Sequence, residues 1–422
     1  MIRAQSSKGI VVALLGTAAL ALAACSSAGN TSAASTSSGG IKTITVGIIG
    51  SLTGGQSSTF QNLPKYSEDR LNEANETHEI PGVQIKYVVV DNQSTPQGEL
   101  SAAQDLVENK HVSAIITDDA LAFAATSYLA KTGIPVVAPG FDGPEYGVSS
   151  NRNLFSQIGS NDPRNHSVTT WGKLFQSQGV TKLAIVGYGD SPSSSATTKD
   201  FEESAKPVGI SVPYFTLAPT FGDTNMTQIA IAIKNSGANG VATELETNTE
   251  EALYVALKQA GVNLKAFFVN TGYGSDTLDS PQLLHDMQGV DFTNWDPPIE
   301  LNNAATKAYA ADLRKYAGVT SDPGFAEQNG WLTADLLVAG LKLAAPDETP
   351  ANVVNKLRAD KDYNPYGLLP VGEDYSTFGN GTATLAPGNC EWVTQLTGQV
   401  FKPLAGENPV CGVNIPNSDA SS

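Results

Sequence analysis

The side chains best suited to catalysis or metal binding are few and far apart. The chain has four histidines and three cysteines; no histidine forms an HExxH motif or lies beside a cysteine, so the sequence predicts no metal site. There is no Gly-x-Ser-x-Gly nucleophile elbow, Gly187-Tyr-Gly189 lacks the third glycine of a dinucleotide-binding loop, and no GxxxxGKS/T loop occurs. Carboxylates are plentiful, so an acid pair for glycosidic cleavage stays open. The pattern still disfavours an enzyme and predicts no cofactor.

Two cysteines near the carboxyl end, Cys390 and Cys411, form an isolated pair. Without a neighbouring histidine they fall short of the four ligands of a structural zinc site. In an oxidising compartment outside the membrane, such a pair is expected to form one disulfide.

The third cysteine, Cys25, follows a segment with the pattern of an export signal. Two basic residues precede an apolar run of 16 residues, Gly9–Ala24, which is shorter than the roughly 20 residues that a membrane-spanning helix needs. The run ends in Leu-Ala-Ala-Cys25, which resembles the bacterial lipobox and implies a lipid on Cys25; an ordinary signal peptide is the alternative. We expect a signal peptide over 1–24, a flexible Ser/Ala/Thr/Gly-rich tether over 25–42 and a frayed tail over 416–422. The protein is then exported and lipid-anchored to the outer face of the cell membrane.

Length and charge limit the class of protein. The chain has 422 residues, enough for two lobes of ordinary size. Its 42 acidic and 25 basic residues give a formal net charge of −17. Such a surface repels phosphate backbones, so nucleic acid is not expected as a partner.

The elements that must position any site alternate between strand and helix. Short β-branched runs predict strands at 43–49, 83–90, 112–116, 134–137, 182–186, 240–243 and 266–269. Apolar residues at helical spacing lie between them, including a helix expected over 120–131, whereas the Ser-rich segment 190–198 is expected to be a loop. After about residue 292 come two helices and a shorter third, and from 363 the chain becomes rich in β-strand patterns. This alternation predicts an α/β protein with two doubly wound parallel-sheet lobes.

Several of these segments resemble one family. Ile44-Thr-Val-Gly-Ile-Ile-Gly-Ser-Leu-Thr-Gly54, Val88-Val-Val-Asp-Asn-Gln93 and Gly133-Ile-Pro-Val-Val-Ala-Pro139 are similar, in order and spacing, to the first lobe of type I periplasmic binding proteins, in their branched-chain amino acid and amide branch. Leu183–Val186 and Ala256–Gly261 fit the second lobe. The resemblance implies two lobes joined by a three-segment hinge: lobe I from 43–157 plus 293–363, and lobe II from 158–292 plus 364–415. It also implies a receptor that holds a small polar solute between the lobes and delivers it to an ABC permease.

The same resemblance implies positions in lobe I that contact the ligand. The hydroxyl residues with which amino acid binders hold a carboxylate correspond here to Asp119, Gly140 and Asp142. An ionised Asp repels a carboxylate, so these positions and Asp118 fit a cationic, amide or hydroxyl-rich ligand better. The alternative is structural: Asp118 or Asp119 caps the helix that follows, and Asp142 forms a turn.

In lobe II the positions that bind an ammonium group correspond to Glu246 and Thr271. Glu246 is alternatively part of a solvated acidic loop. Phe60 matches an aromatic residue that covers the ligand in the family, with core packing as its alternative, and Tyr188 and Tyr273 are weaker candidates. Two other functions stay open: a sensory or cell-wall binding protein with this fold, and a hydrolase with an unrecognised site.

Overall fold

The computed structural model describes residues 41–140, 144–157, 167–377, 389–406 and 408–415. Cys25, the predicted signal peptide, nearly all of the tether, Asp142 and the tail after residue 415 lie outside these ranges. Within them, no helix combines the length and the apolar character needed to cross a bilayer. No group of metal-binding side chains occurs in the same ranges.

The first of two sheets is wholly parallel and has the strand order β2-β1-β3-β4-β5. Its strands are β1 (Lys42–Gly50), β2 (Val83–Asp91), β3 (Ala114–Asp118), β4 (Val136–Ala138) and β5 (Leu154–Ser156). The helices between them are α1 (Ser57–Phe60), α2 (Leu63–Glu76), α3 (Pro96–Gln104), which continues as a π-helix over Asp105–Asn109, and α4 (Thr126–Leu129).

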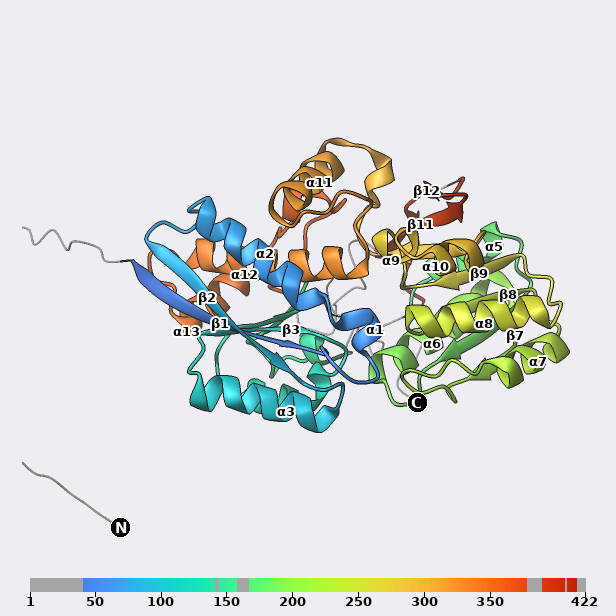
Figure 1. The fold of residues 1–422 in the computed structure, drawn as a ribbon, viewed down its shortest axis with the longest axis horizontal. Coiled ribbons are helices and arrows are strands. Elements are labelled where there is room, and N and C mark those ends of the chain that lie inside the picture. The colour runs from blue at the N-terminus through green and yellow to red at the C-terminus, as the bar shows by residue number, and fades with distance from the viewer. Residues whose placement is uncertain (1–40, 141–143, 158–166, 378–388, 407, 416–422) are drawn as a thin grey trace, which may run out of the picture. The chain divides into compact units, whose positions relative to one another are not determined.

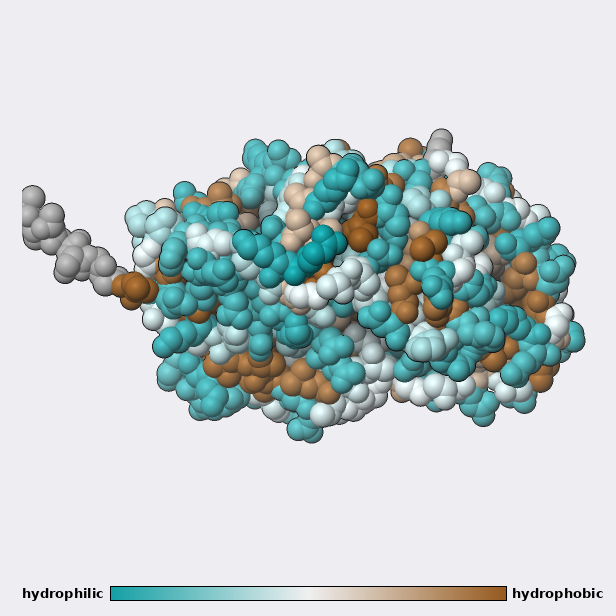
Figure 2. Space-filling view, turned by 45° about the horizontal axis from the view of Figure 1, so that its top comes forward, coloured by the Kyte–Doolittle hydropathy of each residue, from teal (hydrophilic) through white to brown (hydrophobic). Residues whose placement is uncertain are grey.

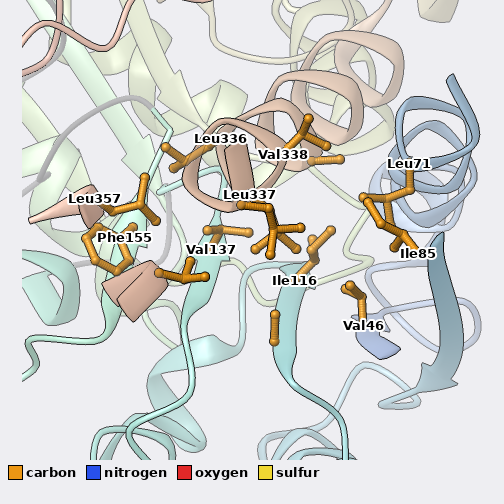
Figure 3. Close-up of a cluster of buried hydrophobic side chains, with 14 of the residues drawn as sticks. Val46, Leu71, Ile85, Ile116, Val137, Phe155, Leu336, Leu337, Val338 and Leu357 are labelled. Carbon is orange, nitrogen blue, oxygen red and sulfur yellow. The ribbon is translucent and has the colours of Figure 1, made fainter. Parts of the chain in front are cut away.

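Side chains alternate between the two faces of this sheet. Val46 and Ile48 pack with Leu71 of α2 and with later helices, whereas Ile49 points to the other face, toward α3 and its extension. The later helices are α11 (Ala304–Tyr316), α12 (Phe325–Ala344) and α13 (Pro350–Leu357). Figure 1 shows α2, α12 and α13 on one side of the sheet and α3 on the other, and Figure 3 shows the shared apolar cluster. Each face is therefore covered, as a parallel sheet requires.

The second sheet repeats the order of the first. Its parallel strands run β7-β6-β8-β9-β10, and antiparallel β11, β12 and β13 extend one edge. The strands are β6 (Lys182–Gly187), β7 (Ser211–Thr216), β8 (Gly240–Glu244), β9 (Ala266–Val269), β10 (Asp291–Asn294), β11 (Cys390–Thr397), β12 (Val400–Pro403) and β13 (Val410–Cys411). The helices are α5 (Thr170–Ser177), α6 (Pro192–Ala205), α7 (Thr227–Ser236), α8 (Thr247–Gln259), α9 (Ser275–Leu278) and α10 (Pro281–Asp286). Two apolar clusters cover its two faces.

The chain passes between the two sheets three times: after β5, after β10 and before β11. Side chains tie these passages together. Gln157 Nε2 donates to Asp296 Oδ2 at 3.3 Å, and the Tyr375 hydroxyl donates to the Ser156 carbonyl at 2.8 Å. Tyr375, which lies beyond the lobe boundary predicted at 363, packs in the core of the first sheet. Two parallel-sheet lobes joined by three segments are the predicted fold class, and the fold is confirmed.

Two local predictions were wrong. The Ser-rich segment 190–198 is not a loop, because most of it belongs to α6. Ser191 caps this helix by accepting a hydrogen bond from the Ser194 N–H at 3.2 Å, and Pro192 occupies its first position. The helix expected over 120–131 is instead a 3-10 turn at Ala122–Ala124 followed by the single short helix α4. Both segments consist mainly of small residues, which leave little apolar periodicity in a helix. The apolar pattern therefore predicted neither 190–198 nor 120–131 correctly.

The predicted disulfide is present. Cys390 Sγ and Cys411 Sγ are bonded, and the two residues face each other across the β11–β13 pair. Figure 2 shows one face of the molecule, on which hydrophilic residues separate the apolar side chains into small groups. Among the described residues, no large apolar patch interrupts the hydrophilic surface on this face.

Candidate functional site

A pocket of about 450 Å³ of empty space, partly open to solvent, lies where residues of both sheets meet. Tyr188, Glu244–Glu246, Asn270–Thr271 and Trp295 follow or end strands β6, β8, β9 and β10. Ligands of open parallel sheets bind beyond these carboxyl ends. Thr59, Phe60, Ala120 and Phe325 line the pocket from the elements of the first sheet. The pocket is therefore the candidate site, and it has a wall from each lobe.

Glu246 is the central charged group of the second-lobe wall. It is the N-cap residue of α8 and is only 3% exposed. Its Oε2 accepts a hydrogen bond from the Gly222 N–H at 3.1 Å, whereas its Oε1 has no partner among the described residues. Burial raises the pKa of Glu246 to about 7, although the Gly222 N–H acts in the opposite direction. The sequence alternative of a solvated acidic loop is wrong for this residue, because its side chain is buried.

Two further glutamates belong to the same wall: Glu244 lines the pocket, and Glu250 lies beneath its surface. Glu244 accepts a hydrogen bond from Asn270 Nδ2 and has a pKa raised by burial to about 8. Glu250 lies deeper, where Thr243 Oγ1 and Thr271 Oγ1 each donate to it at 2.8 Å. Burial raises the pKa of Glu250 well above its ordinary value. Thr271 thus lines the pocket as predicted, and its hydroxyl proton is already donated to Glu250.

Five aromatic residues line the pocket, beside the three serines Ser191, Ser193 and Ser194 at the start of α6. Tyr188 stacks on Phe221 with ring centroids 4.6 Å apart, and its hydroxyl donates to Thr249 Oγ1 at 2.9 Å. Across the pocket, Phe60 meets Phe325 edge-on at 5.8 Å. Trp295 lies between this pocket and a neighbouring one. The site is thus an aromatic enclosure with carboxylates on one wall.

The neighbouring pocket shares Asn270, Thr271, Trp295 and Phe325 with the first and extends the cleft by about 360 Å³. Tyr273 lines this second pocket and donates its hydroxyl proton to Glu300 Oε2 at 2.5 Å. Tyr273 therefore lies in the extension rather than in the main pocket.

Asp118 and Asp119, two of the predicted acidic positions of lobe I, do not line either pocket. Asp118 is fully buried at the end of β3, where its Oδ2 accepts a hydrogen bond from Ser67 Oγ at 2.7 Å. Asp119 Oδ1 accepts from the Leu121 N–H at 2.6 Å, and the Glu99 carboxyl group hydrogen-bonds the same side chain. Burial raises the pKa of both aspartates, that of Asp119 to about 7. Neither aspartate caps a helix, because the elements that follow have no side-chain cap; Asp118 instead bonds to α2 through Ser67, and Asp119 holds the turn at Leu121.

Gly140, also predicted, is buried at a φ of +100° and does not line the pockets. Asp142 lies outside the described residues. Of the residues predicted from the sequence, the structure places Phe60, Tyr188, Glu246 and Thr271 in the main pocket and Tyr273 in the neighbouring one.

Sequence reasoning missed eleven of the fifteen residues that line the main pocket, among them Thr59, Phe221, Glu244, Trp295 and Phe325. Trp295 and Glu244 had a usable signal, because each lies at the carboxyl end of a strand, but β10 had not been predicted. Phe221 and Phe325 reach the pocket from segments remote from any predicted strand end. Only the tertiary structure reveals their place.

Comparisons with known proteins agree with this geometry. The sequence model of a family described as periplasmic binding protein matches residues 43–397. No curated protein sequence matches the chain. Among solved structures, a fatty acid ABC transporter substrate-binding protein from Thermomonospora curvata superposes with a TM-score of 0.73 at 16% identity, covering 90% of this chain and 95% of that one.

Two other solved structures are similar to the same extent. An ABC transporter solute-binding protein from R. palustris, in complex with 4-hydroxybenzoate, has a TM-score of 0.67 at 20% identity and covers 87% of this chain and 98% of its own. A branched-chain amino acid ABC transporter protein from Thermus thermophilus, with bound valine, has a TM-score of 0.69 at 15% identity and covers 88% and 97%. At these identities the likeness establishes the fold, and the family model covers most of the chain. The chain therefore belongs to the periplasmic binding protein family and has its type I fold.

Proposed function

We propose that this chain is the extracytoplasmic solute-binding receptor of an ABC importer, which closes two lobes on a small organic molecule without converting it chemically. The observation that carries the proposal is the pocket itself. Its walls come from both lobes, it lies beyond the carboxyl ends of parallel strands, and it contains buried polar atoms without a partner in the described chain. A ligand that satisfies those atoms holds the two walls together.

The three connecting segments support a hinge. Gln157 of the first segment donates to Asp296 Oδ2 of the second at 3.3 Å, so these two segments meet where the chain passes between the lobes. Rotation about a few residues in such segments moves one lobe against the other without disturbing either core. We therefore propose that the solute stabilises the closed arrangement because only this arrangement lets both walls contact it.

The structural relatives bind different solutes, among them 4-hydroxybenzoate and valine. The ligand of this chain therefore cannot be inferred from any one of these relatives, and a broad ligand screen is the proper test. A thermal-shift screen with amino acids, amides, amines, aromatic acids and fatty acids is expected to reveal at least one stabilising compound. A ligand at about 100 times its Kd stabilises by roughly 2.7 kcal/mol, which is measurable as a rise in Tm.

The lipid anchor is tested separately. We propose that Cys25 carries a lipid that holds the receptor at the outer face of the cell membrane, next to its permease. Metabolic labelling with a fatty acid is expected to mark the wild-type chain and not the Cys25→Ser variant. Equal labelling of both chains would contradict the anchor and leave the binding function unaffected.

A further inference from the structure

We infer that the cleft takes an organic cation, an amine with an apolar body and no carboxylate group, whose ammonium nitrogen lies against Glu246 inside the aromatic enclosure. This inference rests on the proposed receptor function and narrows its ligand class. Three features of the pocket point to this ligand class: its unpartnered polar atoms, its charge and its aromatic ring faces.

The first feature is a pair of buried oxygens without partners. Glu246 Oε1 and Thr59 Oγ1 belong to side chains that are 3% and 9% exposed, and neither has a hydrogen-bond partner among the described residues. Both residues line the main pocket, one from each lobe. Leaving a buried carboxylate oxygen without a donor is costly, so the pocket is incomplete without a ligand. A hydrogen-bond donor on the ligand completes it, and an ammonium N–H is the strongest donor for a carboxylate.

The second feature is the charge of the lining. Among the described residues of the main pocket and its extension, Glu244, Glu246 and Asp296 are acidic, and none is Lys, Arg or His. An anionic ligand would meet these carboxylates with no basic side chain to balance it. A cation instead favours the ionised state of Glu246, whose burial otherwise holds a proton on it near neutral pH.

The third feature is the aromatic surface. Rings of Phe60, Tyr188, Phe221, Trp295 and Phe325 line the pocket. Aromatic faces attract ammonium groups through the ring quadrupole and also cover the apolar part of an organic amine. A metal ion or a polyol gains little from such walls, which favours an organic cation over both.

The lining also argues against a carboxylate on the ligand. In lobe I the residue after β3 that lines the pocket is Ala120, and the neighbouring Asp118 and Asp119 lie behind it. The amino end of α6, where Ser191, Ser193 and Ser194 line the pocket, favours an anion through its free N–H groups. Part of that end is occupied: Pro192 has no N–H, Ser191 Oγ accepts from the Ser194 N–H, and Ser194 Oγ donates to the Glu244 carbonyl oxygen. The pocket therefore suits an ammonium group better than the carboxylate of a free amino acid.

The test compares ligands that differ only in their polar head group. One series is phenethylamine, phenethyl alcohol, 3-phenylpropanoate and L-phenylalanine; the other is isoamylamine, isoamyl alcohol, 4-methylpentanoate and L-leucine. Isothermal titration calorimetry at pH 7.5 is expected to give the tightest binding for the amine of at least one series. The alcohol, the acid and the amino acid of that series are expected to bind at least about tenfold more weakly, the loss that follows from removing one charge-assisted hydrogen bond.

A matched pair of variants locates the effect. Glu246→Gln keeps the side-chain shape and is expected to weaken amine binding by roughly 10- to 100-fold. Glu203→Gln removes one negative charge from an exposed pair with Lys206, outside the cleft, and is expected to leave amine binding unchanged. Because the ligand comparison uses the wild-type chain, it stays decisive even if Glu246→Gln fails to fold.

The outcomes separate the two proposals. Tighter binding of a carboxylate, an alcohol or an amino acid than of its amine would overturn the cation inference and leave the receptor function intact. Equal loss of amine binding in both variants would also overturn it, since the effect would then be one of net charge. If neither these compounds nor any member of the broad screen binds, both the cation inference and the receptor function fail.

Discussion

Replacing Glu246 by Gln is expected to stabilise the ligand-free protein at alkaline pH and to change little at acidic pH. Glu246 has a pKa of about 7 in the folded chain, against 4.5 for an ordinary glutamate, because its carboxyl group is buried. Between pH 4.5 and pH 7, Glu246 therefore holds a proton in the folded chain that it has lost in the unfolded chain. The contribution of Glu246 to stability therefore falls as the pH rises from about 4.5 through 7.

The size of the effect follows from the same two values. One step in pKa corresponds to about 1.4 kcal/mol, so ionising Glu246 in the folded chain costs up to roughly 3 kcal/mol at pH 8. Glutamine avoids this cost, while its carbonyl oxygen still accepts from the Gly222 N–H that now bonds to Oε2. Tyr188 and Asp190 face Glu246, and Glu244 lines the same pocket; all three are retained in the variant.

Urea denaturation of the ligand-free wild type and of Glu246→Gln at pH 5 and pH 8 measures this difference. The variant is expected to gain about 1–3 kcal/mol over the wild type at pH 8 and about 1 kcal/mol or less at pH 5. Glu203→Gln, the exposed control, is expected to change stability equally at both pH values. If Glu246→Gln changes the unfolding free energy by the same amount at both, the carboxyl group is not held in a protonated state by burial.

Three other sets of substitutions give further tests. Replacing Cys390 and Cys411 by Ser opens a loop of sequence separation 21 and is expected to lower the unfolding free energy by roughly 3 kcal/mol, measured by urea denaturation; an unchanged midpoint would contradict a stabilising disulfide. Gly330→Ala places a Cβ 2.3 Å from the Leu63 carbonyl oxygen, where α2 and α12 cross, and is expected to cost about 1–3 kcal/mol; a normal Tm would refute this close approach. Phe60→Ala is expected to weaken the best solute of the screen by about tenfold with a smaller change in Tm, since the ring lines the pocket; unchanged affinity would return Phe60 to a packing role.

Much of the fold was predictable because parallel strands buried on both faces leave clear runs of β-branched residues. Residues 43–49 and 83–90 form β1 and β2 nearly as predicted. β7 (Ser211–Thr216) was missed, since at the edge of its sheet its side chains alternate between exposed and half-buried. The helix α6 was missed because Ser193, Ser194 and Thr198, which its packing buries, are polar and small.

The site was predictable where it follows strand ends. Glu246 and Thr271 each lie two residues beyond the ends of β8 and β9, so their sequence position already indicated the cleft. Asp118 and Asp119 also follow a strand, but their side chains bond to Ser67 and to the Leu121 N–H and so turn away from the pocket. No sequence pattern distinguishes a carboxylate that lines a pocket from one that supports the turn behind it. Residues such as Phe221 and Phe325 required the three-dimensional arrangement.

The central claim is that a solute is held in the cleft, where Trp295 lies. The chain has four tryptophans, and the other three, Trp171, Trp331 and Trp392, are buried in the lobe cores. The most direct measurement is tryptophan fluorescence during titration with the compound that raises Tm most, in wild type and in Trp295→Phe. If the solute binds in the cleft, a saturable change is expected in the wild type and is lost in Trp295→Phe, with calorimetry still showing one bound molecule. A change of the same size in both proteins would place the solute elsewhere and contradict the account.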